Sequence, residues 1–233
     1  MTTSIAQSMP HAARSPTERF MHALGPHVRH VIWDFNGTLL DDVDLCVDLI
    51  NRMLEDEGLS PLSTEAYKRV FDFPVRDYYV RLGFDLSGDR FEELAVRWLA
   101  DYEREAPGCA LQPEAPELLT QLKSRGVHNY VLSASLTRTI VSLLDHHQII
   151  REFREIVGRD DHYAHGKEEL GLELKARHGL DPETTVLIGD TTHDHAVAEA
   201  LGVRCILVAN GHHPEERLRA LGCTVVASLE ELS

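Results

Sequence analysis

Two short acidic motifs of the 233-residue chain contain residue types that can perform chemistry. The first, Asp34-Phe-Asn-Gly-Thr38, follows the β-branched run 28–33. A carboxylate on a tight turn directly after a strand can present one oxygen to an electrophilic phosphorus atom. Gly37 permits such a turn, and Thr38 can hydrogen-bond into it. The same residues could form an Asn-Gly turn without any chemistry, so this motif alone does not decide the function.

The second acidic motif, Gly189-Asp190-Thr-Thr-His-Asp194, also follows a strand-like run. Two carboxylates four residues apart at a strand-to-helix junction suit an octahedral oxygen site for Mg²⁺. In the alternative, Asp190 is a helix N-cap and Asp194 is an acid in the first helical turn, where acids are favourable. Taken in isolation, the segment leaves both interpretations open.

Two further segments could bind a phosphate group. Ser133-Ala134-Ser135 follows another strand-like run, and a serine hydroxyl together with backbone N–H groups can hold phosphoryl oxygens. Lys167 opens a helical stretch, where its ammonium could balance clustered carboxylates and a transferring phosphate. The alternatives are a helix N-cap at Ser133 and an ordinary surface lysine.

The elements that must position these residues alternate between strand and helix. Strand-like runs cover 28–33, 127–132, 155–157, 185–188, 205–208 and 224–226, and helical stretches cover 113–124, 136–146, 166–178, 193–201 and 214–221. This alternation predicts an α/β fold, a Rossmann-like parallel sheet with helices on both faces. Ligands of such sheets bind at the carboxyl ends of the strands, where Asp34, Ser133, Asp190 and Asn210 are expected. The pair His212-His213 is expected at the rim of that edge.

One stretch of the chain breaks the alternation. Between residues 43 and 110 apolar residues recur with helical spacing, and no convincing strand is present. We therefore expect an α/β core of residues 28–42 and 111–233, with a small α-helical cap domain of residues 43–110 inserted after the first strand. Residues 1–27 are rich in Ser, Thr, Ala, Pro and His and lack the apolar stretch of a secretory signal, which predicts a flexible N-terminal arm.

The charge and the cysteines narrow the class of partner. The chain has 38 acidic and 23 basic residues and a formal charge of −15, which repels nucleic acid and anionic membranes. A phosphate site in such a chain needs local positive charge, and a bound metal ion would supply it. Four scattered cysteines without metal-ligand spacing favour reduced thiols in a cytoplasmic protein. We expect a monomer or homodimer that acts on a small molecule.

Together and in this order, the four segments resemble the haloacid dehalogenase superfamily, most closely its phosphoglycolate-phosphatase-like branch with a small helical cap. The family's motifs are DxDx[TV], a Ser or Thr at a strand end, a Lys, and an acidic GDxxxD. The resemblance implies a Mg²⁺-dependent phosphatase that hydrolyses a small phosphate ester through an aspartyl-phosphate. The roles that it implies are a nucleophile at Asp34, a charge-neutralising Lys167, and phosphate contacts from Gly37, Thr38, Ser133 and Ala134. It also implies metal ligation by Asp34, the backbone carbonyl of Asn36, Asp190 and Asp194.

The chain departs from the family pattern at Asn36. Family phosphatases have a general acid and base at this position, and an amide cannot exchange a proton usefully near neutral pH. Turnover on alkyl phosphates is therefore expected to be slow, because general acid–base help contributes roughly 10²–10⁴-fold. Asp42, His193 and His195 are near enough in sequence to be weighed as a surrogate base, although both histidines are expected on a helix surface.

Two other functions stay open. A phosphonate hydrolase would need a cap lysine for a Schiff base, and Lys68 is the only lysine of the inserted region. A protein that binds a phosphorylated metabolite without turnover would also explain Asn36. Selectivity for an anionic substrate could come from Lys68, Arg69 and Arg76 in the cap, although a solvated helix surface is the commoner reason for such residues.

Overall fold

The computed structural model describes residues 24–160 and 166–232. Most of the expected N-terminal arm, 1–27, lies outside these residues. Of its last four residues, Leu24 is buried against the core. Within the described part of the chain, no helix is both long and apolar enough to cross a membrane. The exact domain limits stay a prediction.

Six parallel strands form the central sheet, in the order β5-β4-β1-β6-β7-β8. At its centre, β1 pairs Trp33 with Val131 on one side and with Ile188 on the other. Asp34, the next residue, therefore lies in the middle of the carboxyl edge of the sheet, where parallel sheets bind ligands. The strands are β1 (His30–Trp33), β4 (His128–Leu136), β5 (Phe153–Arg159), β6 (Thr185–Gly189), β7 (Arg204–Val208) and β8 (Thr224–Val226).

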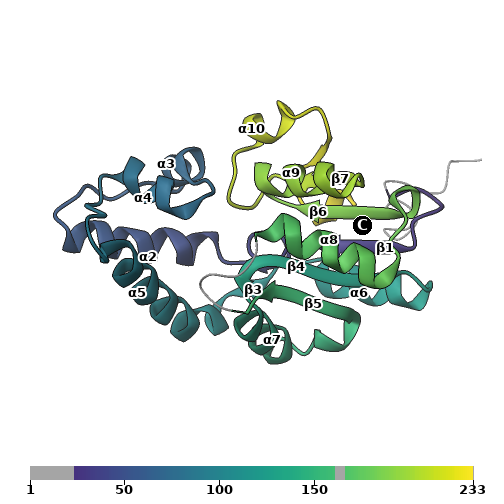
Figure 1. Cartoon of the computed structure of the whole chain (residues 1–233). Coiled ribbons are helices and arrows are strands. Elements are labelled where there is room, and N and C mark those ends of the chain that lie inside the picture. The colour runs from purple at the N-terminus through teal and green to yellow at the C-terminus, as the bar shows by residue number, and fades with distance from the viewer. Residues whose placement is uncertain (1–23, 161–165, 233) are drawn as a thin grey trace, which may run out of the picture.

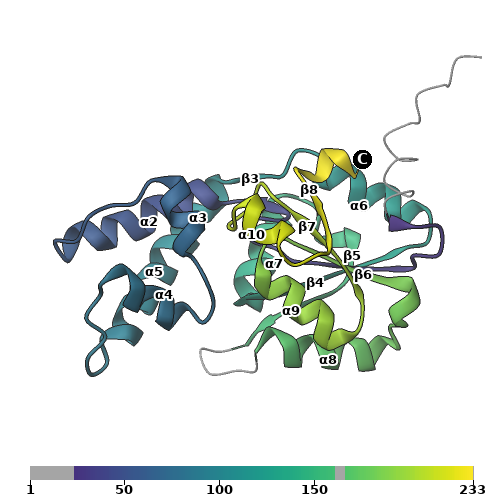
Figure 2. The same cartoon turned by 90° about the horizontal axis from the view of Figure 1, so that it is seen from above.

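Helices cover both faces of this sheet, as the alternation predicted. Val31 and Trp33 pack on the side of α6 (Ala115–Ser124) and α7 (Thr137–His146), whereas Ile32 packs on the side of α8 (Lys167–His178) and α9 (Thr192–Leu201). Figure 2 shows α8 and α9 below the sheet and α6 above it. Because both faces are buried, the central strands β1, β6 and β7 are almost continuously apolar after their first residue. The remaining elements of the core are α10 (Glu215–Arg219) and the 3₁₀ turns Ile150–Glu152, Pro182–Thr184 and Leu229–Glu231.

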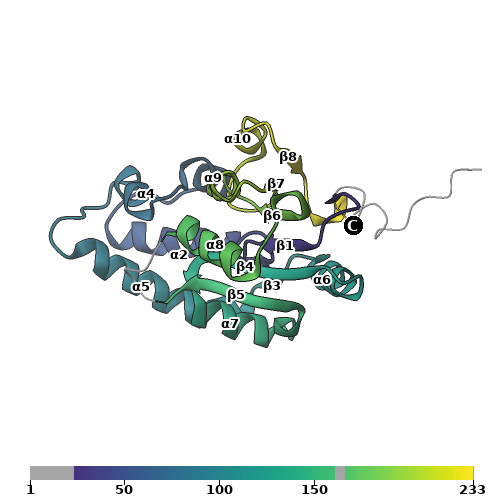
Figure 3. The same ribbon diagram turned by 45° about the vertical axis from the view of Figure 1, so that its right-hand side comes forward.

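The predicted helical insertion is present as a separate cap. In Figures 1 and 3 its helices stand to one side of the sheet, beyond the carboxyl ends of the strands. A two-stranded antiparallel ribbon, β2 (Leu40–Asp41) with β3 (Ala110–Leu111), joins the entering and leaving chains. Two-residue strands are too short to show a periodicity, so the sequence pattern did not reveal them. The cap consists of α2 (Val43–Asp56), α3 (Thr64–Val70), α4 (Val75–Leu82), α5 (Arg90–Glu105) and the 3₁₀ turn Ala106–Gly108.

The strand expected at 127–132 is longer than its pattern indicated. β4 continues through Leu136, which pairs with Arg159, and its pairing with β5 is irregular between Leu132 and Leu136. Within this irregular end, the Ser133 hydroxyl accepts a hydrogen bond from the Ser135 N–H at 3.1 Å. The three small residues Ser-Ala-Ser carry no β-branched pattern, which hid the strand end. Ser133 is therefore part of an irregular strand, not the N-cap of the following helix.

Candidate active site

Asp34 is held at the end of β1 by backbone contacts. Its N–H donates to the Ile188 carbonyl at 2.8 Å, and its side chain is buried in the wall of a cavity. The chain then turns tightly, because the Leu40 N–H donates to the Phe35 carbonyl at 3.0 Å. Gly37 has a φ of +73°, and a Cβ there would lie 2.6 Å from the His212 ring. Glycine is therefore required at this position by both the backbone and the space.

Three carboxylates from the two acidic motifs meet beside Asp34. Asp34, Asp190 and Asp194 each offer an oxygen within 4.8 Å of the others, and all three are buried. Thr191, and not Asp190, is the N-cap of α9, and it forms a capping box with Asp194. One Asp194 oxygen accepts from the Thr191 N–H at 2.9 Å, while the other faces Lys167. Asp194 thus serves the helix terminus and the carboxylate cluster at once.

Asp190 is fixed by neighbours on two loops. Its carboxylate accepts from the Thr38 hydroxyl at 2.8 Å and from the His212 N–H at 2.6 Å. The side chain is fully buried. Thr38 therefore orients Asp190, and neither Thr38 nor Gly37 is among the residues that line the cavity. A phosphate contact from these two residues stays a prediction.

Lys167, the first residue of α8, lies among these carboxylates. Its buried ammonium contacts Asp34 and Asp194. Burial acts against its charge, but the two carboxylates raise the pKa of Lys167 above its usual value. Burial raises the pKa of Asp34 well above its usual range, despite Lys167, whereas the contact with Lys167 outweighs burial and lowers the pKa of Asp194.

The cluster fits a hard divalent cation by both charge and donor type. Burial raises the pKa of Asp34 and of Asp190, because a single ammonium does not balance three buried carboxylates. A bound divalent cation would favour their ionised forms. Every ligand that the three carboxylates offer is an oxygen, the donor type that Mg²⁺ prefers.

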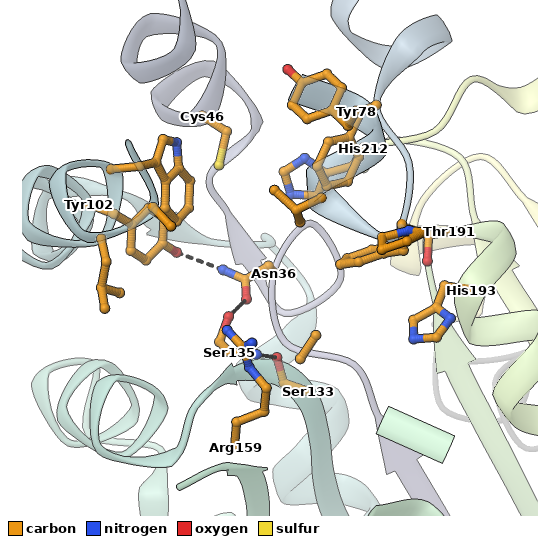
Figure 4. A pocket seen from close by; sticks show the side chains of 18 of the residues that line it. Asn36, Cys46, Tyr78, Tyr102, Ser133, Ser135, Arg159, Thr191, His193 and His212 are labelled. Atoms are coloured by element: carbon orange, nitrogen blue, oxygen red, sulfur yellow. Dashed lines mark hydrogen bonds between the residues drawn. The ribbon is translucent and has the colours of Figure 1, made fainter. Parts of the chain in front are cut away.

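Asn36, at the position of the family acid and base, is held at both ends of its amide. Its oxygen accepts from the Ser135 hydroxyl at 2.6 Å, and its nitrogen donates to Asp42 at 2.7 Å and to the Tyr102 hydroxyl at 2.6 Å. Figure 4 shows the contacts of Asn36 with Tyr102 and Ser135 across the pocket, with Ser133 beside Ser135. The pKa of Asp42 is lowered because hydrogen bonds from His212, Asn36 and Tyr102 outweigh its burial. The amide therefore supports an ionised neighbour.

His212 completes this polar group from the loop after β7. The ring is 4% exposed, lies 3.3 Å from the Asp42 carboxylate and 3.0 Å from the Tyr67 hydroxyl, and reaches the cavity. Although burial lowers it, the pKa of His212 is raised to about 8 by Asp42. The expected rim position is wrong, because His213 is also fully buried. The contacts of Tyr102 and His212 with Asp42 were not predicted, since no local spacing links either residue to it.

The three residues considered as a surrogate base differ in their distance from the cavity. Asp42 and His193 line the cavity, and His193 is half-buried there, with its ring 4.9 Å from that of Phe73. His195 instead faces Glu199 on α9, at 3.6 Å.

One cavity of about 840 Å³ connects the core to the cap. On the core side it is lined by Asp34, Lys167, Asp194 and the predicted phosphate residues Ser133 and Ala134. Of the three cap cations weighed for selectivity, Arg76 lines the cavity, whereas Lys68 and Arg69 do not. Lys68 lies 3.5 Å from the Asn210 carbonyl.

Comparison with known proteins agrees with this geometry. The family described as haloacid dehalogenase-like hydrolase matches residues 31–208. Phosphoglycolate phosphatase from Synechococcus elongatus is 27% identical over 191 residues, 82% of this chain and 88% of the relative. A haloacid dehalogenase-like hydrolase from Bacteroides fragilis has a similar structure, with a TM-score of 0.78 at 24% identity over 88% of this chain and 100% of that one. Protein tyrosine kinase A from Mycobacterium tuberculosis has a TM-score of 0.73 at 25% identity, over 89% and 97% of the chains. The family match covers most of the sequence, and the chain belongs to the haloacid dehalogenase-like hydrolases, as the order of its motifs predicted.

Proposed function

We propose that the chain is a Mg²⁺-dependent phosphatase that hydrolyses small phosphate monoesters through an aspartyl-phosphate on Asp34. The observation that carries this proposal is the position of Asp34 in the cavity wall, in contact with Lys167 and beside Asp190 and Asp194. A relative named phosphoglycolate phosphatase supports the reaction class. The cytoplasm as location and a monomer or homodimer as assembly stay predictions.

In the first step an Asp34 oxygen attacks phosphorus in line, and the ester P–O bond breaks as the new bond forms. Ser133, with backbone N–H groups near Ala134, would bind the equatorial oxygens, and Lys167 would balance their charge. Asp34, Asp190, Asp194 and the backbone carbonyl of Asn36 would hold Mg²⁺, whose charge would offset the repulsion between the nucleophile and the phosphate.

The second step is hydrolysis of the aspartyl-phosphate by water. Asn36 can neither protonate the leaving oxygen in the first step nor accept a proton from water in the second. Both steps therefore proceed without the help that an acid at this position would give, and slow turnover follows.

The geometry supports the phosphonate hydrolase less well. A Schiff-base lysine must be neutral and reach the substrate. Lys68 does not line the cavity, and the lysine that does, Lys167, is held as an ammonium by two carboxylates.

Hydrolysis of p-nitrophenyl phosphate tests the proposal. We expect activity with Mg²⁺, none with EDTA, and a loss of at least about 10⁴-fold in kcat for Asp34→Asn. Asp44→Asn, which neutralises an exposed acid on α2, is the matched control and should retain full activity. Equal activity of Asp34→Asn and wild type would refute the mechanism. An inactive wild type that still binds inorganic phosphate would instead identify a binding protein.

A further inference from the structure

The cap offers the cavity aromatic surface that its own packing leaves uncovered. Three of its tyrosines lie inside the cap core and are at most 3% exposed: Tyr67, Tyr78 and Tyr79. All three also border the cavity with little exposed surface, whereas four other rings that line it stay half-buried: Phe71, Phe73, Phe91 and Trp98. The first set stabilises the cap, whereas the second set leaves apolar surface open to a ligand.

Part of this aromatic surface, at Trp98, reaches the reaction centre through Tyr102. The Tyr102 hydroxyl lies 2.6 Å from the Asn36 amide nitrogen, and the Trp98 ring stacks on Tyr102 with centroids 4.9 Å apart and planes 15° from parallel. Asn36 is two residues from the nucleophile Asp34, and all four residues line the same cavity. A group bonded to the transferring phosphate would therefore extend along these rings.

The charges of the cap wall fit a small anionic substrate poorly. Among the described cap residues that line the cavity, the charged ones are Arg76 and Glu92. The Arg76 guanidinium lies 5.1 Å from the centre of the Phe91 ring and donates to the Leu86 carbonyl at 3.4 Å. Against the cap wall, a second carboxylate such as that of phosphoglycolate would meet Glu92 and an arginine that already lies over Phe91, although Arg159, at the end of β5, also lines the cavity on the core side. The 840 Å³ cavity is also within the range that holds drug-sized ligands.

Asn36 restricts the leaving group independently. An alkoxide must be protonated as it departs, and an amide cannot supply that proton. An aromatic hydroxyl, with a pKa of about 10 as in tyrosine, can depart as its anion. The pocket wall and the missing acid thus favour the same chemistry.

We infer, on the basis of the proposed function, that the substrates are aryl phosphate monoesters whose ring lies against Trp98 and Phe91. The Asp34–phosphorus bond forms while the bond from phosphorus to the aryl oxygen breaks. The aryl oxygen keeps the electron pair, leaves as a phenolate and takes a proton from solvent. Water then attacks phosphorus, releases the Asp34 carboxylate and yields inorganic phosphate, with its proton passing to solvent.

The test compares three substrates with Mg²⁺ present: 2-naphthyl phosphate, acetyl phosphate and phosphoglycolate. Acetyl phosphate has a good leaving group but no ring. Phosphoglycolate has no ring, and its leaving group is an alkoxide that needs a proton. We expect kcat/KM for 2-naphthyl phosphate to exceed that for acetyl phosphate by about tenfold, the contribution expected from ring contacts. It should exceed that for phosphoglycolate by at least about 10²-fold, because phosphoglycolate also lacks acid assistance.

Variants locate the ring contact. Trp98→Ala should lower the ratio of 2-naphthyl to acetyl activity by about tenfold, and Phe91→Leu, which keeps an apolar side chain, should lower it by about threefold. Val80→Ala, at a 59% exposed cap position outside the cavity lining, should not change the ratio. In wild type, 2-naphthol should inhibit competitively and glycolate should not, a result that needs no variant.

Several outcomes would overturn the inference while leaving the proposed function intact. These are a preference for phosphoglycolate, equal use of acetyl and 2-naphthyl phosphate, or an equal loss of both activities in Trp98→Ala and Phe91→Leu. The proposed function itself would fail if p-nitrophenyl phosphate and acetyl phosphate were also untouched, or if Asp34→Asn hydrolysed them as fast as wild type.

Discussion

The two walls of the cavity differ in kind. The core wall carries buried charges that hold one another, with Lys167 between Asp34 and Asp194 and the latter tied into the start of α9. The cap wall carries half-buried rings, among them Trp98 and Phe91. Charges fixed in a dry site suit a reaction that develops charge, whereas rings suit recognition of an apolar group. The proposed function and the inferred substrate class therefore place the reaction on the core wall and the choice of substrate on the cap wall.

Because the buried charges of the core wall contact one another and also surround the reacting phosphate, a change there should affect both the stability of the protein and its rate. Lys167→Met should leave Asp34 and Asp194 without their counter-ion. At pH 8 in EDTA we expect the free energy of unfolding to fall by about 3–5 kcal/mol. The kcat/KM for p-nitrophenyl phosphate with Mg²⁺ should fall by about 10³-fold.

Denaturant titration and steady-state kinetics measure these two effects of Lys167→Met. The loss of stability should shrink as pH falls, since protonation of Asp34 removes an uncompensated charge. Lys123→Met, with a lysine whose side chain is 52% exposed, is the control and should change neither quantity. A Lys167→Met protein as stable as wild type would show that the core wall is not held by its charges.

Asn36→Asp tests the place where the two walls meet, because Asn36 contacts Tyr102 of the cap. The new carboxyl group would lie against Asp42, which the amide nitrogen contacts at 2.7 Å, and repulsion should raise the pKa of one of the two acids. A protonated acid at this position can assist the leaving group, so kcat/KM for alkyl phosphates should rise by about 10²-fold, with a smaller gain for aryl phosphates.

Pre-steady-state kinetics give a second readout for Asn36→Asp. Wild type should release p-nitrophenol in a burst, because its aspartyl-phosphate is hydrolysed without a base, and the variant should lose the burst. Asn210→Asp adds the same charge after β7, outside the cavity lining, and should produce neither effect. An equal gain on alkyl and aryl substrates would mean that Asn36 does not limit leaving-group departure.

The fold and the charged core wall were predictable because their signals are local in sequence. Asp34, Asp190 and Lys167 each follow or open an element that is visible from its periodicity, and a parallel sheet brings strand ends together. Tyr102 and His212 are 60 and 170 residues from Asp42, which they contact. No spacing encodes such contacts, since they depend on how the cap is placed over the core.

A smaller effect concerns His213, which lies beneath the cap beside Phe71, with ring centres 6.0 Å apart. Burial, and next the charge of Arg217, lower the pKa of His213 to about 4. As the pH falls, His213 is therefore protonated earlier in the unfolded chain, where its pKa is near 6.5, than in the folded chain. The contribution of His213 to stability is complete above pH 6.5 and is lost as pH falls toward 4.

Between pH 7.5 and 5 this loss should be on the order of 2 kcal/mol. In wild type the Thr192 N–H donates to the His213 ring at 3.0 Å, and His213→Asn keeps an acceptor for it. This variant should remove the part of the pH dependence of stability that His213 causes. Unfolding titrations at both pH values measure it, and His146→Asn at an exposed site is the control. An unchanged pH dependence in His213→Asn would show that the ring is not kept neutral by burial.

The smallest effect is expected at Arg217, which joins the core to the cap outside the cavity lining. From α10 its guanidinium donates to the Phe71 carbonyl at 3.0 Å and to Asp72 at 2.7 Å, both in the cap. The pair is part-exposed, with side chains 29% and 31% accessible, so its contribution to stability should be at most about 1 kcal/mol and should weaken with salt. Arg217→Met should therefore leave unfolding nearly unchanged while raising KM for aryl phosphates two- to threefold, roughly the same free energy. Arg219→Met removes a pair within α10 and should not alter KM. If Arg217→Met and Asp72→Asn have additive effects on KM, their contact does not hold the cap over the core; if the double variant equals either single one, it does.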